Sequence, residues 1–322
     1  MTSEVLLNES KRASEVCSLK GNTMNNTNVK NLKAAHEDYR IGYVTSKDGT
    51  IIGYRQYGHG PSIVLVQGTM GTAHNFIQLA EALADSFTVY VPDRRGRGLS
   101  GLGGNDYSIQ KEVEDLDALL AKTGALYVFG LSSGAIITLQ AAITQPDIRK
   151  LAIFEPPLFT NGTTPMALIG RYENEMANGN VAAALITGMK AGQFGPPIFN
   201  IMPQWLLESL INMMMKGEEK KGSGGYVPMR ELALTLHNDF QLVSEMSDKL
   251  HSFRAVGTEV LMLGGSKSPA YLKIALDDLE KILPQNKHIE LLGLGHAAPW
   301  NRDRGGQPEV VAQALRQFFA ER

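Results

Sequence analysis

Short apolar runs and longer amphipathic stretches alternate along most of the chain. The short runs are rich in Val, Ile, Phe and Tyr and are bounded by Gly, Pro, Asn or Asp, which is typical of strands. In the longer stretches apolar residues recur every three or four positions, which is typical of helices. Strands are predicted at 39–45, 50–57, 62–67, 87–91, 126–129, 150–154, 259–263 and 287–292.

Helices are predicted between most of these strands. One has a clear start and stop, because Ser108 is a good N-cap, apolar residues then recur on one face, and Gly124 ends the pattern. Strand and helix in this alternation imply an α/β fold, a mostly parallel, doubly wound sheet with crossover helices on both faces. The helices are predicted at 75–84, 109–123, 135–142, 271–283 and 308–319.

Two segments depart from this alternation. Residues 1–38 are polar, and we expect a flexible N-terminal extension there. Residues 159–254 are helical in pattern throughout, apart from a charged and then Gly-rich link at 217–225. Within this second segment the predicted helices are 166–176, 181–189, 205–216 and 229–246.

Composition narrows the classes of partner. The 322 residues are 43% apolar, and 31 Lys and Arg against 33 Asp and Glu give a net charge of -2, so we expect no nucleic-acid partner. The single cysteine, Cys17, cannot form an internal disulfide, which favours a reducing compartment. No stretch approaches the roughly 20 apolar residues of a membrane span. We therefore expect a cytoplasmic protein without a membrane partner.

Residues 130–134 read Gly-Leu-Ser-Ser-Gly, a G-x-S-x-G pattern between a predicted strand and a predicted helix. A strand that turns sharply into a helix at such a pattern forms a nucleophile elbow, whose central serine holds a strained backbone and exposes its hydroxyl. We interpret Ser132 as a nucleophile. Its base is best sought at the same edge of the sheet, and His296 lies in a small-residue loop after the last strand, where parallel strands deliver their C-terminal ends.

Together these segments resemble the α/β-hydrolase superfamily. The resemblance covers about 40–158 and 255–322, and it rests on the elbow, on Gln67-Gly68-Thr69 after the third strand, and on Asp-Arg-Arg-Gly-Arg-Gly-Leu-Ser at 93–100. It implies an α/β-hydrolase fold with its core at 39–158 and 255–322 and an inserted helical cap at 159–254. We interpret the loop at 93–100 as structural, with arginines suited to surface ion pairs.

The acid of a catalytic triad needs a separate assignment, because Ser268-Pro269 stands where the family often has an Asp after the seventh strand. Glu155 ends the sixth strand, next to the strand of the elbow. Certain haloalkane dehalogenases and the zearalenone lactonases place the acid there, and the layout resembles theirs. The resemblance thus implies the triad Ser132, Glu155 and His296; the alternative for Glu155 is a surface ion pair.

Backbone N–H groups complete the predicted site. An oxyanion hole is expected from the N–H of Ser133, after the nucleophile, and that of Thr69 in the third-strand loop. The family often has His-Gly where this chain has Gln67-Gly68, which a loop acting through its backbone tolerates. We expect Met70 and Trp205 to contact substrate, Met70 beside the hole and Trp205 in the roof of the pocket.

These residues favour a serine hydrolase that cleaves a carboxylic ester or lactone of a small molecule through an acyl-enzyme. The sequence has no metal-ligand spacing and no phosphate-binding glycine loop, so we expect neither a metal nor a cofactor. Two alternatives stay open. The same fold also supports lyase, acyltransferase or perhydrolase chemistry, and it serves as a non-catalytic small-molecule receptor.

Overall fold

The computed structural model describes residues 39–102, 104, 106–159, 163–195, 197–219 and 226–321. The predicted extension, with Cys17, lies outside the described residues, as does most of the predicted link at 217–225. The first residues of that link belong to a helix instead.

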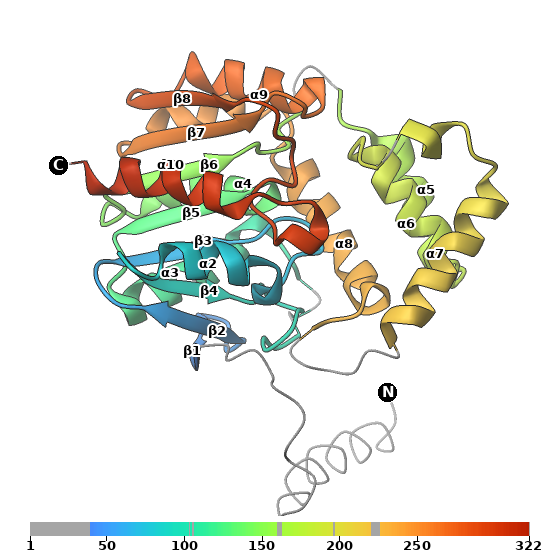
Figure 1. Cartoon of the computed structure of the whole chain (residues 1–322), viewed down its shortest axis with the longest axis horizontal. Coiled ribbons are helices and arrows are strands. Elements are labelled where there is room, and N and C mark those ends of the chain that lie inside the picture. The colour runs from blue at the N-terminus through green and yellow to red at the C-terminus, as the bar shows by residue number, and fades with distance from the viewer. Residues whose placement is uncertain are drawn as a thin grey trace, which may run out of the picture. The chain divides into compact units, whose positions relative to one another are not determined.

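Eight strands form one sheet in the order β1-β2-β4-β3-β5-β6-β7-β8 (Figure 1). β1, β2 and β4 pair antiparallel, and all other neighbours are parallel. All eight were predicted, although β4 separates β2 from β3, so the first hairpin does not adjoin the third strand. The strands are β1 (Arg40–Thr45), β2 (Ile51–Gly58), β3 (Ser62–Val66), β4 (Thr88–Pro92), β5 (Tyr127–Leu131), β6 (Lys150–Phe154), β7 (Glu259–Gly265) and β8 (Asn286–Leu291).

Both faces of the inner strands are buried. On β3, Val64 and Val66 pack into the apolar cluster of α3, α4 and α9, whereas Ile63 and Leu65 pack into that of α2 and α10. Burial on both sides explains why these strands are almost continuously apolar in sequence. The helices of the core are η1 (Ala73–Phe76), α2 (Ile77–Leu83), α3 (Ile109–Thr123), α4 (Ser133–Thr144), η3 (Leu250–Ala255), α9 (Ala270–Glu280), η4 (Arg302–Arg304) and α10 (Pro308–Ala320).

The ends of α3 follow the local chemistry of the sequence. The Ser108 side chain accepts a hydrogen bond from the Lys111 N–H, which satisfies one of the free amides of the first turn. Gly124 ends the helix in the left-handed conformation, with φ 63°, a geometry that glycine adopts without a Cβ penalty. Both end residues are those predicted.

The cap is formed by helices with an apolar core of their own. Leu185, Leu207, Ile211 and Met215 are buried in it, and α8 packs on α4 of the core as well as on its neighbours in the cap. Figure 1 shows α5, α6 and α7 to one side of the sheet with α8 next to the core. Tyr39–Arg322 is one compact unit. The cap elements are α5 (Met166–Ala177), α6 (Val181–Ala191), η2 (Pro197–Asn200), α7 (Gln204–Glu219) and α8 (Met229–Glu245).

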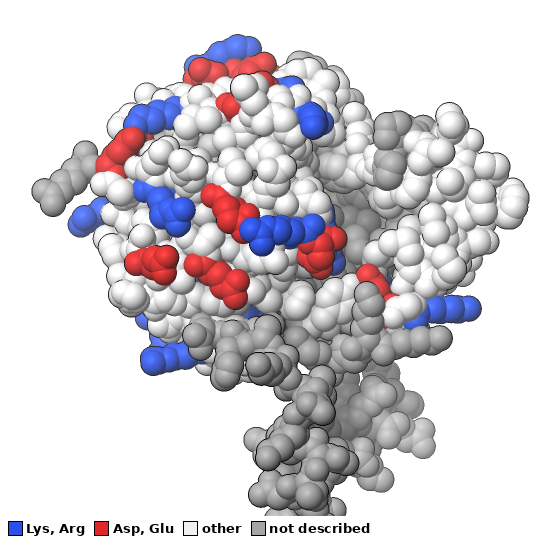
Figure 2. All heavy atoms as spheres, in the orientation of Figure 1, with Lys and Arg blue, Asp and Glu red and all other residues white. Residues whose placement is uncertain are grey.

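On the face shown in Figure 2, charged side chains are unevenly distributed. In the view of Figure 2, acidic and basic side chains are interspersed over the sheet and its helices, whereas the cap carries few of either sign. Among the described residues, no helix combines the length and the apolar character needed to cross a membrane. Exposed apolar residues of the cap include Met166, Ile198, Ile201, Trp205, Leu206 and Met213.

Candidate active site

A cavity of about 1060 Å³ lies where the cap meets the C-terminal ends of the strands. Ser132, His296 and Thr69 line it from the core, so the structure brings the predicted nucleophile, base and oxyanion loop to one place. The cap supplies most of the remaining wall, which is predominantly apolar. Its lining residues include Ile169, Leu185, Met189, Phe194, Phe199, Met214, Leu232 and Phe240.

The elbow has the backbone expected of a nucleophile. Ser132 follows β5 with φ 55° and ψ -124°, and Ser133 begins α4, so the positive end of that helix faces the turn. A Cβ on Gly134 would lie 2.5 Å from the carbonyl oxygens of Val66 and Gln67. Glycine there lets α4 pass close to the end of β3.

Three non-glycine residues with positive φ gather at this site. Met70 (φ 54°), Ser132 (φ 55°) and Glu155 (φ 46°) lie just beyond β3, β5 and β6, which are neighbours in the sheet. Each such conformation costs on the order of 1–3 kcal/mol and persists only where its surroundings enforce it. Met70 occupies a turn that the Gly71 N–H closes on the Gly68 carbonyl oxygen at 3.1 Å. The strain at Met70 and Glu155 could not be read from the sequence.

Glu155 is fully buried and holds His296. Its Oε2 accepts a hydrogen bond from His296 Nδ1 at 2.7 Å, and its Oε1 accepts one from the Gly265 N–H at 2.6 Å. The alternative of a surface ion pair is therefore wrong. A Cβ on Gly264 would lie 3.3 Å from Oε1, so glycine at this position of β7 leaves room for the carboxylate.

A loop of the cap covers the imidazole. Phe194 stacks on His296, with the ring centroids 5.0 Å apart and the planes 13° from parallel. Tyr271 of α9 fixes this loop to the core, because its hydroxyl donates to the Gly192 carbonyl oxygen at 3.2 Å. Burial and the nearby charge of Glu155 raise the pKa of Tyr271, which keeps the phenol protonated for this bond. Sequence reasoning missed both residues, since neither carries a motif.

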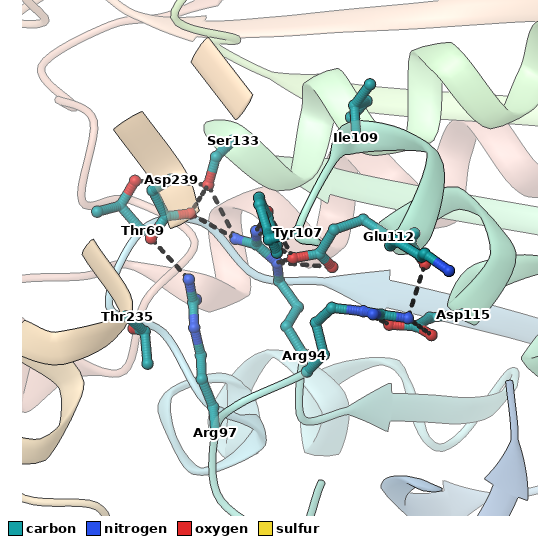
Figure 3. Close-up of polar contacts among 12 residues, drawn as sticks. Thr69, Arg94, Arg97, Tyr107, Ile109, Glu112, Asp115, Ser133, Thr235 and Asp239 are labelled. Carbon is teal, nitrogen blue, oxygen red and sulfur yellow. Dashed lines mark hydrogen bonds and ion pairs between the residues drawn. The ribbon is translucent and has the colours of Figure 1, made fainter. Parts of the chain in front are cut away.

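The arginines of the loop at 93–100 are buried, which corrects the expectation of surface ion pairs. Arg94, Arg95 and Arg97 are each no more than 3% exposed. Arg95 pairs with Asp115 of α3, whereas Arg94 and Arg97 both contact Asp239 of the cap helix α8 (Figure 3). The prediction that these arginines form ion pairs at the surface is wrong, because their ion pairs are buried.

Of the two residues predicted to contact substrate, one lines the cavity and the other does not. Met70 lines the cavity and packs against the apolar core of the cap. Trp205 does not line it and is 69% exposed, because α7 turns that face outward. Of the three neighbouring methionines, Met214 lines the cavity, Met215 is buried in the cap and Met213 is exposed.

Three potential metal ligands meet elsewhere. Asp277, Glu280 and His288 come from α9 and β8 and offer ligand atoms within 4.8 Å of one another. Two of the three side chains are exposed, and none of them lines the cavity. Their spacing in the sequence follows no metal-binding pattern, because a helix and a strand bring them together.

A model of the alpha/beta hydrolase family matches residues 63–314, and the chain belongs to that family. A crystal structure of an α/β hydrolase from Sphaerobacter thermophilus is 30% identical, with a TM-score of 0.70 over 86% of this chain and 100% of that one. The crystal structure of N-formylmaleamic acid deformylase from Pseudomonas putida S16 is 19% identical, with a TM-score of 0.57 over 85% and 99% of the two chains, and shows likeness of fold alone.

Curated relatives match over a shorter segment. The chain is 39% identical over 114 residues to the uncharacterized hydrolase YraK of Bacillus subtilis, covering 34% of this chain and 42% of that protein. It is 34% identical over 110 residues to N-formylmaleamate deformylase of Pseudomonas putida, covering 33% and 41%. These matches span about two fifths of the relatives' length.

Proposed function

We propose that this protein is a serine hydrolase of carboxylic esters or lactones. The observation that carries the proposal is the buried Glu155 bonded to His296 at 2.7 Å, in a cavity that also exposes Ser132 on a strained elbow. An acid, a base and a nucleophile in this relation are what acyl transfer from an ester to water requires. The name of the relative N-formylmaleamate deformylase supports hydrolysis of an acyl bond.

The reaction follows from the role of each group. As Ser132 Oγ attacks the carbonyl carbon, its proton passes to His296, and Glu155 stabilises the imidazolium through Nδ1–H. The N–H groups of Ser133 and Thr69 receive the oxyanion. The tetrahedral intermediate expels the alcohol, which takes the proton from His296. Water then loses a proton to His296 and attacks the acyl carbon, and collapse of the second tetrahedral intermediate releases the acid. His296 returns that proton to Ser132 Oγ, which regenerates the hydroxyl.

The cavity favours a bulky, apolar substrate. Its volume of about 1060 Å³ and its apolar lining provide far more room than an acetyl ester fills. Apolar contact contributes about 25 cal/mol for each Å² removed from water, so a large acyl or alcohol part would supply most of the binding energy. We therefore propose an ester or lactone whose acyl or alcohol part is bulky and apolar.

Covalent labelling and product analysis test this function. A fluorophosphonate should label the native protein at Ser132, and 4-nitrophenyl esters of rising acyl length should show kcat/KM increasing with chain length. Products formed with water or an alcohol as acceptor separate hydrolysis from acyl transfer. Failure of every ester, lactone and phosphonate to react would contradict the proposal and favour a receptor.

The wall residue Phe194 should govern binding of bulky substrates. For Phe194→Ala we expect the KM of long-chain esters to rise about 5- to 20-fold, which corresponds to about 1–2 kcal/mol of lost apolar contact. Trp205→Ala is the matched control and should change KM by less than about twofold, because the side chain is exposed and outside the cavity. Steady-state kinetics over an acyl-length series measures both. Equal effects of the two variants would show that Phe194 does not contact substrate.

A further inference from the structure

Asp239 is a buried carboxylate that belongs to the cap but bonds to the core. It lies on α8, is 1% exposed, and takes part in the wall of the cavity. Its Oδ1 accepts hydrogen bonds from Ser133 Oγ at 2.9 Å and from Arg94 Nη1 at 2.8 Å. Its Oδ2 accepts one from Arg97 Nη2 at 2.6 Å (Figure 3). One cap side chain thus contacts the residue that follows the nucleophile.

Arg97 extends this contact to the other side of the oxyanion hole. Its Nη1 donates to the carbonyl oxygens of Gly68 at 2.9 Å and of Gly71 at 3.1 Å, the two ends of the turn that carries Thr69 and Met70. The guanidinium therefore bridges the oxyanion turn and the Asp239 carboxylate. Both proposed oxyanion donors are connected to a single carboxylate, Ser133 directly and Thr69 through Arg97.

The charges of this cluster balance only when Asp239 is present and ionised. Arg94 is also bound by Glu112, at 2.7 Å, so two buried arginines face two buried carboxylates. Complete burial alone would raise the pKa of Asp239, but Arg97 and Arg94 outweigh that effect and lower it. Within the described part of the chain, Asp239 is the carboxylate that pairs with Arg97.

We propose that Asp239 is a positioning residue, which sets the oxyanion hole from the cap. This inference rests on the proposed function, because it concerns the donors of that reaction. Oxyanion donors act only where they already point at the developing charge, and loss of one donor typically costs about 10²- to 10³-fold in rate. Loss of a carboxylate that fixes two donors should therefore lower kcat, although the carboxylate touches neither the reacting atoms nor the triad.

Asp239→Asn tests the inference against a matched control. Asparagine keeps the size but loses the charge and one acceptor, so the turn and Ser133 lose their common anchor. We expect kcat for an ester that the native protein hydrolyses to fall about 10- to 100-fold with KM changed less than about threefold. The affinity of a trifluoromethyl ketone, whose hemiketal oxygen occupies the oxyanion hole, should fall in parallel.

Asp115→Asn is the control. Asp115 accepts two hydrogen bonds from Arg95 at 2.7 Å and also belongs to a buried ion pair, but no hydrogen bond joins it to the turn or to Ser133 within the described residues. The melting temperature of Asp115→Asn should fall as that of Asp239→Asn does. Its kcat and its affinity for the ketone should stay within about threefold of the native values. Equal kcat for the two variants, or a lower kcat of Asp239→Asn with unchanged ketone affinity, would overturn the inference.

Ser133→Ala keeps the test decisive if Asp239→Asn does not fold. It removes the hydroxyl bond to Asp239 but retains the Ser133 N–H, so we expect a several-fold loss of kcat and a matching loss of ketone affinity. Native values of both would overturn the inference. If the native protein neither hydrolyses esters nor reacts with a fluorophosphonate, the proposed function fails and this inference with it. If it does both, only the positioning role is at stake.

Discussion

Ser132→Ala is expected to abolish ester turnover while the protein remains folded. Loss of a serine nucleophile lowers kcat by about 10⁴- to 10⁶-fold, because only the oxyanion donors and substrate binding remain. The fold should tolerate the change, since the Ser132 side chain lines the cavity and makes no capping hydrogen bond to α4. Initial rates and the melting temperature measure the two effects.

Mass spectrometry of phosphonate-treated protein supplies the control. The native protein should carry one adduct, on the peptide that contains Ser132, and Ser132→Ala should carry none. Ser133 is the neighbouring hydroxyl, but it is bonded to Asp239 and Arg94 and should stay unmodified in both. An adduct at another serine in Ser132→Ala, with activity retained, would show that the nucleophile lies elsewhere.

The strands and the nucleophile elbow could be predicted because their signals are local. Inner strands buried on both faces are runs of apolar residues, as at Ser62–Val66 and Lys150–Phe154, and such runs stand out in sequence. The elbow needs glycines at fixed positions, and this requirement is also visible. The position of His296 after the last strand follows from parallel topology alone.

The acid is an intermediate case. Glu155 could be proposed because it ends a strand beside the elbow, but its burial depends on a distant segment. The Gly265 N–H from β7 binds one oxygen and His296 binds the other, and both partners lie more than 100 residues further along the chain. The sequence around Glu155 does not identify partners so far along the chain.

Residues that act through packing were missed. Phe194 stacks on His296, and Tyr271 bonds to the loop that carries Phe194, but no pattern around either residue marks it. The arginines at 94–97 looked like surface residues because charged residues usually lie at the surface. Their burial requires paired carboxylates on α3 and α8, which sequence alone does not bring together.

Glu155→Gln is expected to lower kcat by about 10³- to 10⁴-fold with the fold retained, as the corresponding acid-to-amide change does in serine proteases. The reason lies in the number of acceptors. Two donors, the Gly265 N–H and His296 Nδ1–H, point at the two carboxylate oxygens, and an amide has only one oxygen to offer. If that oxygen serves Gly265, the amide NH₂ faces the imidazole. Nδ1 must then accept instead of donate, so Nε2 carries the proton and cannot take one from Ser132.

Asp277→Asn is the control for this prediction. Asp277 lies on α9 after β7, the strand whose end often carries the acid in this family, but its side chain is exposed and outside the cavity. The variant should retain native kcat. Should Glu155→Gln instead keep more than a tenth of the native kcat, the effect would be below about 1.4 kcal/mol. An imidazole that loses so little without the carboxylate is oriented by another group, and the acid of the triad would have to be sought elsewhere.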